Sequence, residues 1–212
     1  APNIAKAYDT TTELAIAAAI EALRDAGIPL VRTFKMSASG KKVPQGWALP
    51  DSMRLDTGVV FGSCFPGFDE MARHAENNGD DGEGRFDRRF LFQVLPMGHS
   101  QLAQFIGAQG PNTQCNAACA STAQAVAIAE DWLKTGRCRR VIVVGSDNVT
   151  SPNLLRWIGG GFMAAGAAST HDVVEETALP FDARRHGLVL GMGAAALVLE
   201  TRDACEERGI HP

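Results

Sequence analysis

Residues Gly110–Gly136 read GPNTQCNAACASTAQAVAIAEDWLKTG, and this stretch holds the two patterns that decide the fold. Asn112–Asn116 follows a proline and favours a short extended segment, whereas Cys119–Thr135 has a continuous helical pattern that Gly136 ends. The sequence therefore predicts a strand that leads into a long alanine-rich helix, with Cys119 in the first turn of that helix.

Further apolar strands are expected on both sides of this stretch. Thr57–Ser63 (TGVVFGS) and Arg140–Gly145 (RVIVVG) are almost wholly apolar, which is typical of strands covered on both faces. Gly187–Glu200 (GLVLGMGAAALVLE) predicts a glycine-kinked turn and a terminal strand. Strands that alternate with helices predict an α/β fold with a layered sheet.

Two further helices have clear boundaries. Thr10–Ala26 repeats apolar residues at helical spacing, with Thr10 and Glu13 at capping-box spacing and Gly27 at the left-handed position after the last turn. A second helix is expected from Gly98 to Gly107, and a short polar helix precedes Gly209.

Three segments are predicted to be irregular. Ile28–Asp56 has no clean period and is expected to be a surface excursion, Asn77–Arg89 is a charged glycine-rich loop, and Gly159–Gly161 marks a flexible turn. Because no repeat or linker divides the chain, residues 1–212 are expected to belong to one domain.

Composition narrows the class of protein. The chain has 212 residues, 45% of them hydrophobic and 21% charged, with a net charge of -4. No cluster of Lys and Arg favours nucleic acid or an anionic membrane as a partner, and no apolar run or basic leader indicates a membrane span or signal peptide. A cytoplasmic globular protein is the expectation.

The five cysteines are expected to be reduced. Their number is odd, and the chain is too long to need disulfides for stability. Cys115 and Cys119 form the only close pair, and no second pair of ligands lies at a spacing that would complete a tetrahedral zinc site. We therefore expect no metal.

Cys119 is the strongest candidate for chemistry. A cysteine at a helix start lies beside unpaired N–H groups and the positive end of the helix dipole, which favour the thiolate, the nucleophilic form. The alternative is a small buried apolar residue, since free cysteine is often buried.

Gly110–Thr122 (GPNTQCNAACAST) resembles the nucleophile motif of β-ketoacyl synthases, with Cys119 at the position of the acyl-accepting cysteine. Arg140–Asp147 (RVIVVGSD) resembles the strand that follows the nucleophile helix. Leu179–Glu200 is similar to the family's Pro-Phe-Asp segment, glycine-rich turn and last strand, and Thr57–Gly67 to its strand beside the acyl pocket. The resemblance runs in order from about Tyr8 to Gly209.

The resemblance implies the thiolase fold, in which two α/β halves form αβαβα layers and dimerise through the strand Asn112–Asn116. It implies that Cys119 takes an acyl group from a thioester on acyl carrier protein or coenzyme A, and donates its backbone N–H to the oxyanion hole. A malonyl thioester is then decarboxylated and its carbanion attacks the acyl group. No cofactor is implied beyond the phosphopantetheine or coenzyme A that carries the substrates.

The resemblance also places residues around the acyl group. Phe65 and Phe162 fall where the family lines or gates the acyl pocket, although both positions also suit ordinary core packing. Gly191 and Gly193 fall in the glycine-rich turn, where a role in backbone geometry is expected.

The chain departs from the family pattern in two ways. The histidine and lysine motifs that drive decarboxylation are absent, so the five histidines are expected at the surface or in local hydrogen bonds: His74, His99, His171, His186 and His211. Met192 stands where the family usually has a carboxylate. An opening strand before residue 1 and a second half, supplied in cis or in trans, are expected to complete the fold.

Three functions remain open. The leading one is the cysteine-bearing half of a ketosynthase of fatty acid or polyketide synthesis, acting as a homodimer or heterodimer. A noncatalytic partner that resembles a chain-length factor is favoured by Met192 and by the absent histidine motifs, but not by Cys119. A thiolase-type acyltransferase is the third, and the Pro-Phe-Asp segment favours the ketosynthase over it.

Overall fold

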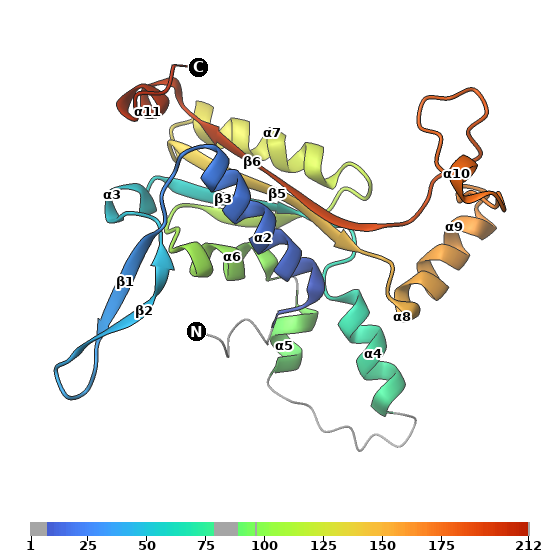
Figure 1. Ribbon diagram of the computed structural model, residues 1–212, viewed down its shortest axis with the longest axis horizontal. Coiled ribbons are helices and arrows are strands. Elements are labelled where there is room, and N and C mark those ends of the chain that lie inside the picture. The colour runs from blue at the N-terminus through green and yellow to red at the C-terminus, as the bar shows by residue number, and fades with distance from the viewer. Residues whose placement is uncertain (1–7, 79–88, 96, 212) are drawn as a thin grey trace.

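A four-stranded sheet lies at the centre of the computed structural model, which describes residues 8–78, 89–95 and 97–211 (Figure 1). The strand order is β4-β3-β5-β6, and β3 is parallel to both β4 and β5, whereas β6 runs antiparallel to β5. The strands are β3 Thr57–Gly62, β4 Asn112–Cys115, β5 Arg140–Asn148 and β6 Met192–Glu200. These positions confirm the predicted strands and the α/β class.

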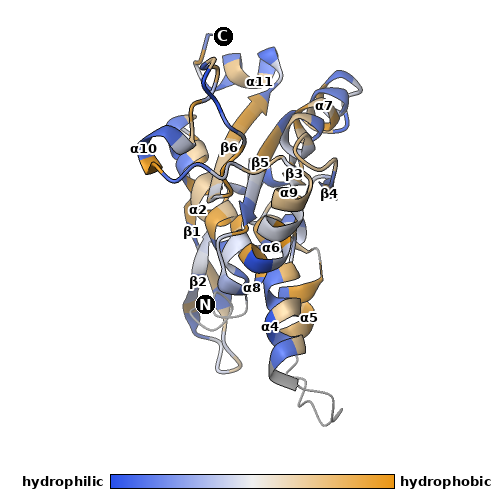
Figure 2. Ribbon diagram, turned by 90° about the vertical axis from the view of Figure 1, so that its right-hand side faces the viewer, coloured by the Kyte–Doolittle hydropathy of each residue, from blue (hydrophilic) through white to orange (hydrophobic). Residues whose placement is uncertain are grey.

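Helices cover both faces of the sheet. Helices α2 (Thr10–Asp25) and α6 (Gly98–Ile106) pack on the face that presents Val59 and Phe61, and α7 (Ser121–Lys134) packs on the face that presents Val60. Neighbouring residues of β3 face opposite sides, as strand geometry requires. Figures 1 and 2 show α2 and α7 on opposite sides of the strands.

The helix ends follow the predicted glycines. Gly27, Gly107 and Gly136 have φ values of 66°, 72° and 69°, in the left-handed region that glycine adopts most easily. The start of α2 differs from the prediction, because Asp9 is the capping residue and its side chain accepts the N–H of Thr12 at 3.0 Å.

The segment Ile28–Asp56 is more regular than predicted. Strands β1 (Val31–Met36) and β2 (Lys42–Ala48) form an antiparallel hairpin, and the short helix α3 (Asp51–Arg54) follows it. Most hairpin residues are exposed, and a register shift lies between Thr33 and Phe34. A hairpin with no buried face shows no apolar alternation, which is why the sequence did not reveal it.

The prediction of a turn at Gly159–Gly161 is wrong. A helix starts where Ser151 accepts the N–H of Leu154 at 3.2 Å, and continues through α8 (Pro152–Leu154), the π-helix η1 (Leu155–Gly159) and α9 (Gly160–Ala164). Additional Cβ atoms at Gly160 and Gly161 would meet open space, so the glycines are not required by packing.

The remaining short helices lie outside the sheet layers. Helices α4 (Phe68–Asn78) and α5 (Arg89–Val94) contact each other, and Figure 2 shows the hydrophobic character of α5. Helix α10 spans Val174–Thr177 and α11 spans Arg202–Glu207. Most of the charged loop predicted at Asn77–Arg89 lies outside the described residues.

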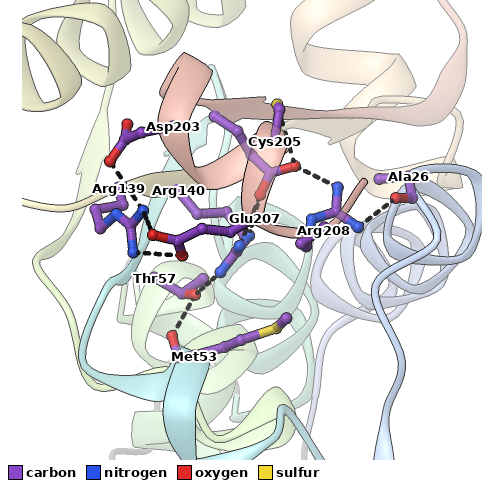
Figure 3. Close-up of polar contacts among 10 residues, drawn as sticks. Ala26, Met53, Thr57, Arg139, Arg140, Asp203, Cys205, Glu207 and Arg208 are labelled. Carbon is purple, nitrogen blue, oxygen red and sulfur yellow. Dashed lines mark hydrogen bonds and ion pairs between the residues drawn. The ribbon is translucent and has the colours of Figure 1, made fainter. Parts of the chain in front are cut away.

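A group of ion pairs fixes the amino end of β5 (Figure 3). The buried Glu200 carboxylate lies 2.6 Å from Arg140 and 2.5 Å from Arg208, whose Nη1 also donates to the carbonyl of Ala26 at 3.0 Å. Arg139 pairs with Asp203 and Glu207 of α11. These contacts hold α11 and the end of α2 against the sheet.

Candidate active site

Cys119 lies in the turn between β4 and α7. We call Asn116–Ser121 the Cys119 turn. Ala120 caps α7 and Ser121 is its first residue, so the prediction of a helix from Cys119 is wrong by two residues. Cys119 therefore precedes the helix rather than occupying its first turn, although it remains near the positive end of the helix dipole. It is the exposed member of the five cysteines.

The backbone of the Cys119 turn is tightly held. The Ser121 hydroxyl accepts the N–H of Ala117 at 3.0 Å and donates to the carbonyl of Ala118 at 2.6 Å. Ala118 has a φ of 50°, a left-handed conformation that is uncommon for a residue other than glycine. Such strain persists only where the surroundings impose it, and it is frequent at functional sites.

The loop Ser63–Phe65, which follows β3, is bonded to this turn through Cys64. The Cys64 thiol donates to the carbonyl of Ala118 at 2.8 Å. The Asn116 side-chain amide donates to the carbonyl of Cys64 at 2.9 Å. The carboxyl ends of the two parallel strands β3 and β4 are thereby joined beside Cys119.

Asp147, near the end of β5, holds the same loop from the other side. Its Oδ1 accepts the Ser63 hydroxyl at 2.8 Å and the N–H of Phe65 at 2.9 Å. The N–H of Cys64 donates to both carboxylate oxygens, at 2.9 and 3.0 Å. One carboxylate therefore binds three consecutive residues of the loop.

Two glycines let α7 approach the sheet closely. A Cβ atom at Gly62 would lie 2.7 Å from the carbonyl oxygen of Ser121, and one at Gly145 would collide with the Thr122 hydroxyl. Only glycine fits at these positions without displacing the start of α7. The start of α7 is thus packed directly on Gly62 of β3 and Gly145 of β5.

The other thiols differ from Cys119 in their surroundings. Burial raises the pKa of each of them above the ordinary thiol value: Cys64, Cys115, Cys138 and Cys205. At Cys64 the negative charge of Asp147 raises the pKa further. These four thiols are therefore poorer nucleophiles at neutral pH than free cysteine.

The two predicted pocket residues belong to different elements. Phe65 is half-buried in the loop that contacts the Cys119 turn, and its ring lies 6.0 Å from that of Phe68. Phe162 is in α9, where its carbonyl accepts the N–H groups of Ala167 and Ala168. Among the described residues, hydrogen bonds join the loop that contains Phe65 to the Cys119 turn. The hydrogen bonds of Phe162 are to Ala167 and Ala168 instead.

The histidines make local contacts. The His171 ring stacks on His186 with centroids 4.2 Å apart, and its Nε2 lies 3.6 Å from the Glu176 carboxylate. The His74 ring meets Phe90 edge-on, burial lowers the pKa of His99, and His211 is exposed. None of these contacts includes Cys119.

The glycine-rich turn lies beside Asp147. The carbonyl of Gly191 accepts the N–H of Val149 at 3.3 Å, and Gly193 pairs with Asp147 across β5 and β6. The exposed Met192 begins β6 opposite Asn148. Met192, which stands where the family usually has a carboxylate, therefore lies beside the end of β5.

Sequence reasoning missed Cys64, Asn116, Ser121 and Asp147 as parts of this site. Asp147 offered one signal, a charge at the end of an apolar strand whose carboxyl end faces the site.

Across residues 8–78, 89–95 and 97–211, no group of three His, Cys, Asp or Glu side chains could hold a metal ion. No helix in these same ranges is long and apolar enough to cross a membrane.

Comparison with known sequences identifies relatives over the whole chain. Residues 1–204 match the family described as "Beta-ketoacyl synthase, N-terminal domain". The chain is 30% identical, over 99% of its length and 46% of the relative's, to the tetracenomycin polyketide synthase ketoacyl synthase alpha subunit of Streptomyces glaucescens. It is 28% identical, over 97% of its length and 44% of the relative's, to 3-oxoacyl-[acyl-carrier-protein] synthase 2 of Staphylococcus aureus strain N315.

Solved structures with a similar fold include ketosynthases. A β-ketoacyl synthase from Burkholderia phymatum STM815 superposes with a TM-score of 0.70 at 23% identity, over 99% of this chain and 46% of that one. A type II polyketide acyl-carrier protein in complex with its ketosynthase bound to the hexaketide gives 0.74 at 20% identity, over 95% and 46%. This chain thus spans about half the length of these relatives. By the match over residues 1–204, the chain belongs to the β-ketoacyl synthase family and contains its N-terminal domain, with a thiolase-like fold.

Proposed function

We propose that this chain is the acyl-accepting half of a ketosynthase and that Cys119 is its nucleophile. The observation that carries the proposal is the contrast between thiols. Cys119 is exposed in a strained turn at the amino end of α7, whereas burial raises the pKa of the other four. An exposed thiol near a helix start is suited to attack a thioester.

The first half-reaction transfers the acyl group. The Cys119 sulfur attacks the carbonyl carbon of an acyl thioester carried by acyl carrier protein or coenzyme A, and a new carbon–sulfur bond forms. The old carbon–sulfur bond breaks, and the carrier leaves as a thiol with the proton that Cys119 gives up. The backbone N–H of Cys119 stabilises the negative charge on the thioester oxygen in the transition state. Phe65, in the adjoining loop, would line the acyl chain.

The second half-reaction requires groups beyond those described around Cys119. A malonyl thioester loses carbon dioxide, the resulting carbanion attacks the acyl carbon, and the Cys119 sulfur leaves. The product is a β-ketoacyl thioester two carbons longer. Donors that stabilise the carbanion as an enolate would come from the second half of the fold, in cis or in trans, because none of the described histidine contacts includes Cys119.

Strand β4 supports a dimer in the proposed enzyme. Among the residues that the structure describes, it is an edge strand of the sheet and pairs with β3 on one side only. An edge strand presents free backbone N–H and C=O groups that can pair with a second copy or a related subunit. Such pairing would place two Cys119 turns near the dimer axis.

The acylation test separates the two half-reactions. Incubation with an acyl thioester is expected to add the acyl mass at Cys119, and the Cys119→Ala variant should gain none. Addition of malonyl thioester to this chain alone should give no β-ketoacyl product. Formation of that product by the purified chain would show that one of its own histidines is the missing catalytic group.

Met192 favours one alternative, a noncatalytic partner subunit that shapes the acyl pocket of a second ketosynthase. The resemblance implies that active relatives usually have a carboxylate in the glycine-rich turn. In this chain the exposed Met192 stands at that position, at the start of β6. The alternative predicts that Cys119 stays unacylated even in a complex with a catalytic subunit, so the same mass measurement decides between the two functions.

A further inference from the structure

Two residues that take no step in the acyl transfer support the Cys119 turn, Cys64 by a direct bond and Asp147 through the loop Ser63–Phe65. Cys64 contacts Ala118 through its thiol, and Asp147 binds the loop that contains Cys64. We propose that Asp147 and Cys64 are positioning residues that fix the orientation of the Cys119 backbone N–H. The inference rests on the proposed function, because it assigns this role relative to an acyl-accepting Cys119.

The argument starts from the planarity of the peptide bond. The carbonyl of Ala118 and the N–H of Cys119 belong to one rigid peptide unit, so a bond that fixes the carbonyl also fixes the direction of the N–H. Two side chains donate to that carbonyl, the Cys64 thiol at 2.8 Å and the Ser121 hydroxyl at 2.6 Å. Together with the N–H of Ser121, which donates to the same carbonyl at 3.0 Å, they hold the peptide unit in the orientation that the left-handed Ala118 requires.

Asp147 fixes the position from which Cys64 donates. Its carboxylate accepts the Ser63 hydroxyl and the N–H groups of Cys64 and Phe65, all within 3.0 Å. Hydrogen bonds to a charged carboxylate are roughly twice as strong as those between neutral groups. Because β5 holds Asp147 in the sheet, the loop and the Cys64 thiol are held against the rigid part of the molecule.

Cys64 suits the role of donor rather than nucleophile. Burial and the neighbouring Asp147 charge raise the pKa of its thiol. The thiol therefore keeps its proton at neutral pH and continues to donate to Ala118. The two thiols beside the turn would thus have different tasks, attack for Cys119 and orientation for Cys64.

The role predicts a difference between two reactions at the same sulfur. Acylation by a thioester needs the oxyanion donor to be oriented, whereas alkylation by iodoacetamide needs only an accessible thiolate. Cys64→Ala should lower the acylation rate of Cys119 about tenfold. This is less than the roughly 100- to 1,000-fold that removal of an oxyanion donor costs, because the Ser121 hydroxyl still donates to Ala118. Its alkylation rate should change by less than about twofold.

The experiment measures both rates at Cys119 by peptide mass mapping in the full chain. Cys64→Ser retains a donor, so it should recover most of the acylation rate that Cys64→Ala loses. Asp147→Asn should show the same selective loss of acylation. Cys205→Ser controls for removal of a thiol elsewhere, and Asp69→Asn controls for loss of a carboxylate that bonds another element, here Ser151 before α8.

The outcomes distinguish this inference from the proposed function. No acylation of the unmodified chain under any condition would overturn both. Acylation of the unmodified chain with equal rates in Cys64→Ala and Cys64→Ser would overturn the positioning role alone. A parallel fall of acylation, alkylation and melting temperature would assign Cys64 and Asp147 to stability only. Where Asp147→Asn fails to fold, the two Cys64 variants still decide the question.

Discussion

Adding one methyl group at Gly62 should disturb both the stability of the fold and the Cys119 turn. Gly62 is the last residue of β3 and is buried. A Cβ atom there would lie 2.7 Å from the carbonyl oxygen of Ser121 and 2.8 Å from its carbonyl carbon, whereas ordinary contacts begin at 3.4 Å. The start of α7 must therefore move by about 0.7 Å, and overpacking of this kind costs about 1–3 kcal/mol.

The displacement has a second consequence, at Cys119. Ser121 orders the turn through its bonds to Ala117 and Ala118, so a shift of Ser121 moves the residue that they flank. For Gly62→Ala we expect a melting temperature lower by about 4–8 °C, which corresponds to about 2 kcal/mol in a chain of this size. The acylation rate of Cys119 should fall by about tenfold or more.

Gly161→Ala is the matched control for this change. It adds the same methyl group in α9, where a Cβ atom meets no atom within 4 Å. Alanine is also the better helix former by about 1 kcal/mol, so stability should stay equal or rise. Differential scanning fluorimetry and the acyl mass measurement would test both variants. A Gly62→Ala protein with unchanged melting temperature and acylation rate would refute the close-packing argument.

Three other changes test separate parts of the structure. Glu200→Gln leaves Arg140 and Arg208 without their buried charged partner. The free energy of unfolding, measured in urea, should fall by about 3–5 kcal/mol. A fall below about 1 kcal/mol would mean that these ion pairs contribute little to stability. Burial lowers the pKa of His99 below 6.5, so as the pH drops below 6.5 the unfolded chain binds the proton first and the folded chain loses stability. His99→Gln should reduce the difference in melting temperature between pH 7.5 and pH 5.5. An unchanged difference would exclude His99 as its cause. Limiting iodoacetamide should label Cys119 before the four partly or fully buried thiols, and first labelling at Cys64, Cys138 or Cys205 would contradict the nucleophile assignment.

The class of fold and most element positions could be predicted from local patterns in the sequence. The apolar runs Thr57–Ser63 and Arg140–Gly145 became the central strands β3 and β5, because strands covered on both faces must be apolar throughout. Gly27, Gly107 and Gly136 ended their helices as expected, because the left-handed position after a helix favours glycine locally. The motif around Cys119 also indicated the family, since its residues are contiguous in the chain.

Local pattern could not predict elements whose stability comes from elsewhere. The β1–β2 hairpin has no buried face to produce alternation. The helix formed by η1 and α9 runs through Gly159–Gly161, which sequence rules assign to a turn. The start of α7 was placed two residues early, because the bonds of Ser121 to Ala117 and Ala118 decide where the helix begins.

Only the tertiary structure assembled the surroundings of Cys119. Ser63 and Asp147 are 84 residues apart, and they meet because β3 and β5 are parallel neighbours whose carboxyl ends lie at one edge of the sheet. Asn116 reaches Cys64 for the same reason, through the pairing of β3 with β4. Strand order and register are set by the packing of the whole sheet between its helices, so no local window of sequence contains the information that places Asp147 and Cys64 beside the nucleophile.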